Sequence, residues 1–241
     1  MDNIYETRRL LDEYLLFHYG SATEVLPWAE GPQQALGFAA RSVHELLDRT
    51  QLPAQALDLG CAVGRSSFEL AALGWQVRGM DFSHRFVQAA EALKQGPLPY
   101  RRWEQGHVYT DLSAQAPQGW QAGGLSFFQG DAMHLPQDLG PVDLVHAANL
   151  LCRLSQPQLL LQRLPDLLRS GGQLLLTTPC TWLAEFTPPQ HWPQGSTQDW
   201  LKAALGADFE LELERDLPFV IREHARKYQW SVAWGTRWRR R

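Results

Sequence analysis

Residues 56–83, ALDLGCAVGRSSFELAALGWQVRGMDFS, contain the side chains of this sequence whose types and spacing are most suited to chemistry. An apolar run reaches Asp58, a loop from Gly60 to Gly64 follows, and a second apolar run ends at Asp81. Glycine lets the backbone turn tightly and approach a ligand, and a carboxylate at the end of the next strand can accept hydrogen bonds from ribose hydroxyls. Asp131, after a third apolar run, is placed to accept a hydrogen bond from an adenine amino group. This order predicts a site for a ligand that contains adenosine.

The spacing within the loop narrows the class of ligand. A nicotinamide or flavin site is expected to have G-x-G-x-x-G, but Ala62 and Arg65 take the second and third glycine positions here. An ATP-binding P-loop would require G-x-x-x-x-G-K-[ST], a string that the sequence lacks. DLGCAVG instead resembles motif I of the class I methyltransferases, which use S-adenosylmethionine and usually have D/E-x-G-x-G-x-G. Ala62 stands where the middle glycine is commonest, and a small residue is expected to be tolerated there.

This resemblance implies a fold and a set of cofactor contacts. The expected fold is α/β, a doubly wound Rossmann-like sheet of seven strands with N-terminal accessory helices and a terminal antiparallel hairpin. The residues expected to hold S-adenosylmethionine are Asp58, Gly60, Cys61, Ala62, Gly64, Asp81, Phe82, Asp131, Ala132 and Asn149. Asn149, in VDLVHAANLL (142–151), is expected to face the transferred methyl group. The side chain of Cys61 itself is expected to pack against its neighbours as a small residue.

Alternating helix and strand patterns provide the elements that must position these residues. Apolar runs typical of buried strands occur at 56–59, 77–80, 125–128, 142–147 and 173–176, and helix-sized segments at 66–73, 83–94 and 158–169 separate most of them. Because parallel strands need long crossovers and are buried on both sides, this alternation predicts a mainly parallel sheet with helices on both faces. Helical spacing at 5–20 and 32–50 predicts packing helices before the core.

The same patterns predict the organisation of the chain. We expect one methyltransferase domain over residues 1–241, with a helical cap at 1–50 and a Rossmann-like core at 51–241. Two long irregular insertions are expected near 96–124 and 180–198, where Gly, Pro, Gln and Trp are frequent. DFELELERDLPF (208–219) and ARKYQWSVAWGTRW (225–238) then alternate like strands, with a turn expected in the proline region between them. They are expected to form an antiparallel pair at the sheet edge.

Composition and charge exclude several classes of partner. The 22 basic and 26 acidic side chains give a net charge of −4, so no overall positive field draws the chain to nucleic acid or to an anionic membrane. The terminal RWRRR (237–241) is interpreted as a solvated tail. The three cysteines, Cys61, Cys152 and Cys180, lack any C-x-x-C spacing, which indicates a reducing cytoplasm and no metal site. No apolar run approaches the roughly 20 residues that span a bilayer.

A second, narrower resemblance covers about residues 4–238. YET (5–7), LLFHYG (15–20), DLGCAVGRSSFELA (58–71), TWLAEFTP (181–188), PFVIRE (218–223) and RKYQW (226–230) are similar to the 4-mercaptohistidine N1-methyltransferases of ovothiol biosynthesis. In that family the enzyme is often the C-terminal domain of a histidine–cysteine sulfoxide synthase, so this chain would be a stand-alone form with a functional link to such a synthase. Tyrosine is usual in the family where this chain has Cys180.

The resemblance implies methylation of an imidazole ring nitrogen of 4-mercaptohistidine, also called 5-thiohistidine, to give ovothiol. The enzyme must align that nitrogen behind the sulfonium carbon and keep the more reactive sulfur out of line. The acceptor-binding residues implied are Tyr5, Glu6, His18, Arg65, Arg153, Trp182, Glu185, Phe186, Arg222 and Glu223, and the catalytic residues are Asn149, Glu185 and Tyr5. Trp182 and Phe186 are expected to stack on the ring, and Arg222 to bind the carboxylate bidentately.

Several alternatives remain open at this point. Trp182 and Phe186 could simply pack a loop, His18 could be structural, and Arg222 and Glu223 could pair with each other at the surface. The acceptor could be another small molecule, or a protein or RNA, for which RWRRR is the only support, and a module that binds the nucleotide without turnover is a third function. A monomer or a weak homodimer is expected, because the edge hairpin could pair but nothing requires it.

Overall fold

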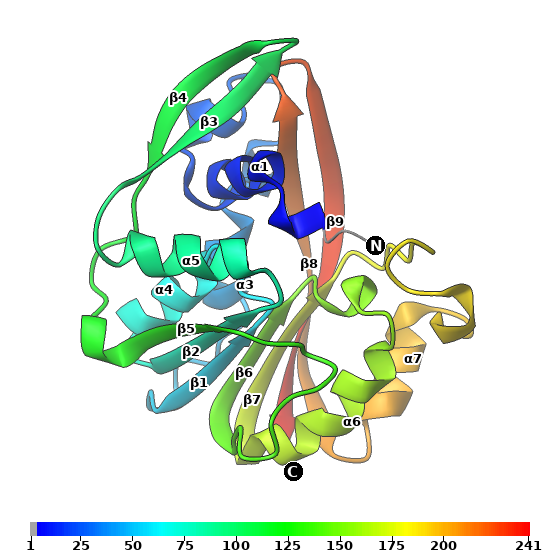
Figure 1. Ribbon diagram of the computed structural model, residues 1–241. Helices are drawn as coiled ribbons and strands as arrows, with labels where there is room; N and C mark the ends of the chain where they lie inside the picture. The colour runs from blue at the N-terminus through cyan, green and yellow to red at the C-terminus, as the bar shows by residue number, and fades with distance from the viewer. Residues whose placement is uncertain (1–3) are drawn as a thin grey trace.

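The computed structural model describes residues 4–241, so the first three residues of the predicted 1–50 cap lie outside the described residues. Its centre is a seven-stranded sheet in the order β5-β2-β1-β6-β7-β9-β8 (Figure 1). The strands are β1 (Gln55–Leu59), β2 (Gln76–Asp81), β5 (Leu125–Gln129), β6 (Val142–Ala148), β7 (Leu168–Thr178), β8 (Phe209–His224) and β9 (Lys227–Arg240). The first five are parallel, and β9 and β8 join them antiparallel. The predicted doubly wound α/β fold is confirmed.

Helices cover both faces of this sheet. They are α1 (Arg8–Tyr19), α2 (Ala22–Val25), α3 (Phe38–His44), α4 (Arg65–Ala72), α5 (His84–Leu93), α6 (Pro157–Leu167) and α7 (Thr197–Leu205). One core cluster unites α1, α3, α4 and α5 with one face of the sheet, and a second unites α6 and α7 with the other. Strand β1 shows the alternation directly, because Ala56 faces the first cluster while Leu57 and Leu59 face the second.

The strand order places the predicted cofactor loop at a topological switch point. The chain leaves β1 toward β2 on one side, and β6 returns to the other side of β1. In open α/β sheets a crevice forms where the order reverses, outside the carboxyl ends of the strands. Gly60, Asp81 and Asn149 follow β1, β2 and β6 and therefore lie at the same edge.

The insertion expected at 96–124 is not irregular. It folds into a hairpin of β3 (Leu98–Gln105) and β4 (Val108–Ala114), which form a separate two-stranded sheet. The hairpin extends over α1 toward the distal end of β8 and β9 (Figure 1). The second insertion is irregular apart from the 3₁₀ turn Pro189–His191 and the start of α7. The expectation of irregular structure at 96–124 was wrong because the strand LPYRRWEQ (98–105) lies in a segment where Gly, Pro and Gln are frequent.

The terminal hairpin is longer than predicted. β8 runs without a turn through Pro218, which pairs with Val232, and the turn comes only at residues 225–226. Proline is compatible with this position because β8 is the edge strand and no neighbour needs its missing N–H. The interpretation of 237–241 as a solvated tail was also wrong, since Trp238 is buried and Arg237 and Arg239 both pair with Glu212.

No helix among residues 4–241 combines the length and the apolar composition needed to cross a bilayer.

Replacement of Trp238 by Ala is expected to lower the free energy of unfolding by about 3–5 kcal/mol, because it empties a large site in the second core cluster. Trp230 on the same strand is 56% exposed and provides the matched control, whose Ala variant is expected to change stability by no more than about 0.5 kcal/mol. Urea unfolding followed by circular dichroism measures both variants. Equal losses in the two variants would contradict the buried position of the C-terminal strand.

Candidate active site

In the loop after β1, three alternate residues, Gly60, Ala62 and Gly64, have left-handed backbone conformations. The φ angles are 69° at Gly60, 49° at Ala62 and 87° at Gly64. A Cβ on Gly64 would lie 2.7 Å from Cζ of Phe127, so this glycine is required by both backbone and space. Ala62 carries some left-handed strain, and its N–H donates to Oδ2 of Asp81 at 2.8 Å. The result is a tight turn at the start of α4, in which Gly60 is half-buried and residues 61–64 are buried.

Asp58 accepts hydrogen bonds from three side chains of the protein. It is buried, and its carboxylate accepts hydrogen bonds from the hydroxyls of Ser66 (2.7 Å) and Ser67 (2.5 Å) in α4 and from Nδ1 of His146 (2.7 Å) in β6. Nε2 of His146 lies 3.0 Å from the hydroxyl of Ser42 in α3. Through these hydrogen bonds, Asp58 and His146 join β1, β6, α3 and α4 beneath the loop. A direct contact with the cofactor remains a prediction.

The electrostatics of this network are set by its donors. Burial by itself raises the pKa of Asp58, but His146, Ser67 and Ser66 outweigh burial, so the pKa is lowered below its ordinary value. The sequence analysis did not identify His146. The available signal was a single ionisable residue inside the apolar run VDLVHAA, which forms a strand buried on both sides.

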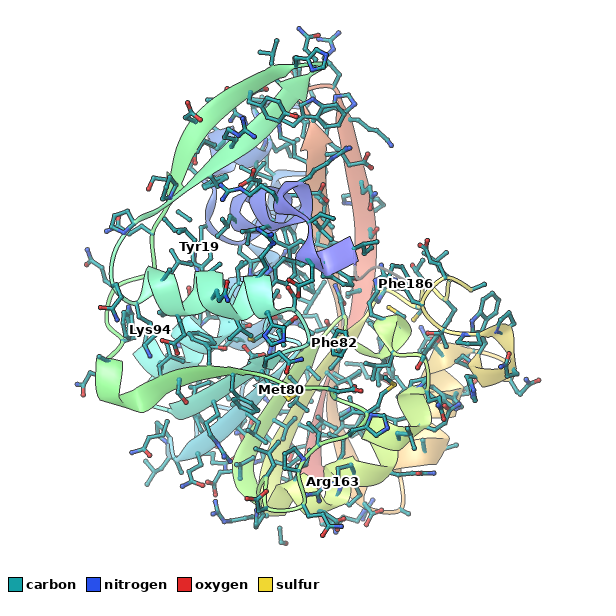
Figure 2. The ribbon with its side chains drawn as sticks, in the orientation of Figure 1. Tyr19, Met80, Phe82, Lys94, Arg163 and Phe186 are labelled. Atoms are coloured by element: carbon teal, nitrogen blue, oxygen red, sulfur yellow. The ribbon has the colours of Figure 1, made fainter. Side chains whose placement is uncertain are left out.

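Asp81 lies at the end of β2, next to the loop. Its Oδ2 accepts from the Ala62 N–H and its Oδ1 from the Ser83 N–H at 2.9 Å. Burial raises the pKa of Asp81 to about 6, although the hydrogen bonds from these two backbone N–H groups lower it. The neighbouring Phe82 is 56% exposed at the end of the strand (Figure 2). A carboxylate with remaining acceptor capacity beside an exposed aromatic ring fits the ribose and base of an adenosine ligand.

The third and fourth strand ends complete the predicted cofactor side. Asp131 accepts from the Met133 N–H at 2.8 Å and pairs with His134, while Ala132 is buried. Asn149 follows β6 with φ of 53°, a conformation that Asn tolerates better than most residues. Its Oδ1 accepts from the Thr177 hydroxyl at 2.8 Å, which fixes the side chain at the edge of β6 and β7.

An aromatic group with one cation lies beside these strand ends. The ring of Tyr5 is 5.9 Å from that of Phe86 and 6.3 Å from that of Phe186, and the Arg153 guanidinium lies 4.5 Å from the Phe186 ring centre. Burial raises the pKa of Tyr5, although Arg153 hydrogen-bonds to it and acts in the opposite direction. Figure 2 shows Phe186 in the loop next to the N-terminal segment. Three predicted acceptor-binding residues, Tyr5, Arg153 and Phe186, are thus brought together.

Glu6 and Tyr5 also anchor the N-terminal segment to α5. Oε1 of Glu6 accepts from the His84 N–H at 2.8 Å, and the Ser83 hydroxyl donates to the Tyr5 carbonyl at 3.0 Å. Glu6 therefore completes the start of α5, where a helix favours negative charge. Its predicted contact with the acceptor remains a prediction.

His18 and Arg65 lie on the other side of the loop. Arg65 bonds Glu69 at 2.6 Å and the carbonyl of His18 at 3.2 Å, and the hydroxyl of Tyr19 donates to the Val63 carbonyl at 2.7 Å. Burial lowers the pKa of His18 to about 3, so its imidazole is neutral at physiological pH. A cavity of about 280 Å³ adjoins His18 and Arg65. These contacts tie the end of α1 to the cofactor loop.

The remaining predicted acceptor residues lie elsewhere or make other contacts. The Trp182 indole donates to the Thr197 hydroxyl at 2.9 Å and packs on Trp200. These contacts agree with the alternative in which Trp182 packs the loop onto the core. Glu185 is exposed in the same loop.

Arg222 and Glu223 do not pair with each other. Arg222 is buried and bonds Glu104 of the β3–β4 hairpin at 2.5 Å, while Glu223 pairs with Lys227 at 2.7 Å. These two residues lie behind α1 and not with the aromatic group around Tyr5.

Replacement of Ser67 by Ala is expected to cost about 1.5–3 kcal/mol, because it removes a donor to a buried carboxylate. Ser126 on β5 is exposed and serves as the control, with an expected change within about 0.5 kcal/mol. Chemical denaturation at pH 7 measures the two variants. A Ser67 variant as stable as the control would show that the network beneath the loop contributes little.

Comparisons with known proteins agree with this geometry. A family model described as a methyltransferase domain matches residues 33–224. A solved protein concerned with the conversion of a disulfide bond into a thioacetal group during echinomycin biosynthesis is 19% identical, with a TM-score of 0.55, 97% of this chain and 93% of that chain covered. An S-adenosylmethionine-dependent methyltransferase from Methanosarcina mazei is 17% identical, with a TM-score of 0.56 and coverage of 82% and 96%.

No curated protein sequence matched the chain. The two structural likenesses support the fold, and the family match extends from before α3 to the end of β8. The glycine loop, the buried acid beneath it and the acidic strand ends fit S-adenosylmethionine as the cofactor. The chain belongs to the methyltransferase domain family and is an S-adenosylmethionine-dependent methyltransferase.

Proposed function

We propose that this methyltransferase transfers a methyl group to an imidazole ring nitrogen of 4-mercaptohistidine and so forms ovothiol. The proposal rests on the sequence resemblance over residues 4–238 and on one structural observation. That observation is the placement of Tyr5, Arg153 and Phe186 together beside the ends of β6 and β7. A planar, thiolate-bearing ring is matched by two aromatic faces and one guanidinium.

The reaction requires one bond to form and one to break. The ring nitrogen attacks the methyl carbon of the sulfonium, the carbon–sulfur bond breaks, and S-adenosylhomocysteine leaves as the ring proton is lost. Tyr5 has a raised pKa and is therefore a neutral hydroxyl, suited to donating a hydrogen bond and not to taking the proton. Glu185, an exposed carboxylate in the adjoining loop, is the candidate acceptor of that proton.

In this proposal, the guanidinium of Arg153 explains why the methyl group goes to nitrogen and not to sulfur. A mercaptoimidazole ionises readily at sulfur, and the thiolate would compete for the methyl group. In our proposal Arg153 and the Tyr5 hydroxyl hold this thiolate, while Asn149 lies where nitrogen and methyl meet. A sulfur held by a guanidinium is both less nucleophilic and out of line with the methyl group. The acceptor would be supplied by a sulfoxide synthase reaction, and the enzyme would act in the cytoplasm.

A turnover assay with S-adenosylmethionine and either mercaptohistidine or histidine tests the proposal, with NMR to locate the added methyl. We expect a single N-methyl product from mercaptohistidine. Replacement of Arg153 by Gln is expected to raise the fraction of S-methyl product and to lower kcat/KM at least about tenfold. Arg78 on β2 is exposed and is not one of the predicted site residues, so its Gln variant is the control. A folded protein that binds S-adenosylhomocysteine but leaves mercaptohistidine unchanged would refute the acceptor, and labelling of macromolecules in cell extract would point to another.

The affinity for S-adenosylhomocysteine is expected to fall as the pH drops below about 6. The folded pKa of Asp81 is raised to about 6, and ribose hydroxyls donate to its ionised form, so protonation opposes binding. Between pH 7 and pH 5 the loss should be roughly tenfold, because the ionised fraction falls by about that factor. Calorimetric titration measures this, and the Asp81→Asn variant should bind more weakly and without the pH step. A step that persists in that variant would assign it to another group.

A further inference from the structure

A second pocket, of about 130 Å³, lies between α1, the β3–β4 hairpin and the distal part of β8. Figure 1 shows the hairpin extending over α1 toward the upper end of β8 and β9. The lining residues are Arg8, Arg9, Asp12, Glu13, Leu16, Arg101, Arg102, Trp103, Tyr109, Arg222 and Glu223. A pocket of this size has room for several waters or one small metabolite.

This pocket is separate from the methyl-transfer site. With 3.6 residues per turn, Arg9, Asp12 and Leu16 project from one face of α1, and Tyr14 and His18 from the opposite face. The contacts agree: Arg9 lies 4.3 Å from the Trp103 ring centre, whereas Tyr14 packs against Phe86 at 4.7 Å. The full thickness of the helix stands between the two sites.

The pocket contains charged groups of both signs, and some of their polar atoms have no hydrogen-bond partner among the described residues. The guanidiniums of Arg9 and Arg101 stack on Trp103 and Tyr109, and within residues 4–241 no carboxylate lies within ion-pair distance of either. Arg222 is 5% exposed, and its Nε has no hydrogen-bond partner among the described residues. Unpaired buried donors of this kind are rare in folded proteins.

The acidic side of the pocket also has unused hydrogen-bonding capacity. Asp12 is 6% exposed, and its Oδ1 forms an ion pair with Nη2 of Arg8 at 2.9 Å but accepts no hydrogen bond from the described residues. Glu13 faces the same space, and burial, together with the nearby Glu223, raises its pKa to about 7 against the effect of Arg9. A ligand that carries a cation next to an anion would satisfy both sides.

We propose that this pocket binds a small free α-amino acid, with its carboxylate on Arg9, Arg101 and Nε of Arg222 and its ammonium on Glu13 and Asp12. A simple carboxylate would leave Glu13 without a cation, and a simple amine would leave Arg9 and Arg101 without an anion. Because α1 also carries Tyr14 and His18 on its other face, the ligand would contact the same helix that packs against Tyr5 and Phe86. The pocket is thus a binding site that is distinct from the acceptor site and independent of the acceptor's identity.

The probe is L-alanine, with propionate and isopropylamine as analogues that lack the ammonium or the carboxylate. Binding is followed by the NMR shift of the Trp103 indole, whose N–H donates to the Gly106 carbonyl at 3.0 Å, with the cofactor site filled by S-adenosylhomocysteine. We expect L-alanine to shift this resonance and to bind at least tenfold more tightly than either analogue. No shift at any concentration would mean that the pocket holds only water, and equal binding of propionate would mean a plain anion site. Either result overturns the proposal.

The direction of the pH dependence separates the amino acid from an anion. The charged groups around Glu13 are Arg8, Arg9 and Asp12 from α1, Arg101 and Arg102 from the hairpin, and Arg222 and Glu223 from β8. An ammonium requires ionised Glu13, so L-alanine should bind about tenfold more weakly at pH 6 than at pH 8, and Glu13→Gln should remove this step. A simple anion would bind more tightly at pH 6.

Two further variants complete the test. Arg101→Gln, on the exposed hairpin, should weaken L-alanine binding about tenfold while the KM of methyl transfer stays unchanged, because it contacts neither cofactor nor acceptor. Arg78→Gln should change neither quantity. If Arg101→Gln raised the KM for the methyl acceptor as strongly as it weakened L-alanine, the two pockets would be one site and the proposal would fail.

Discussion

The buried carboxylate of Asp58 is the constraint on which the rest of the site depends. It cannot be left without donors in an apolar interior, so one histidine from β6 and two hydroxyls from α4 converge on it. Those donors fix where α4 begins and how β6 sits against β1. The left-handed loop between β1 and α4 is therefore held in place by hydrogen bonds on its Asp58 side.

The N-terminal segment is also attached to this loop, on the side opposite the Asp58 network. Tyr19 and Arg65 join the end of α1 to the loop, while Glu6 and the Tyr5 carbonyl join the segment to the start of α5. These contacts use backbone groups that helix ends and turns leave available. The cap thus places Tyr5 over the strand ends because its two attachment points flank the predicted cofactor site.

The elements predicted correctly from the sequence are those that local periodicity determines. Runs such as 77–80 and 142–147 are short, apolar and separated by helical segments, so the parallel strands and the strand-end positions of Asp81 and Asn149 could be found. The strands of the two hairpins could not be bounded in the same way, because edge strands such as β8 and β3 alternate with charges and tolerate Pro218. His146 and the partners of Arg222 depend on contacts between residues far apart in the chain, which no periodicity reports.

Helix α1 connects the second pocket physically to the methyl-transfer site. Its polar face meets the β3–β4 hairpin and its aromatic face meets the methyl-transfer side, so any ligand that orders one face lowers the entropy cost of ordering the other. Thermodynamic linkage makes this effect reciprocal for binding: cofactor or acceptor must change the affinity of the second pocket by the same factor. Burial raises the pKa of Tyr14, and the charge of Glu13, which lines the second pocket, adds to that shift from across the helix.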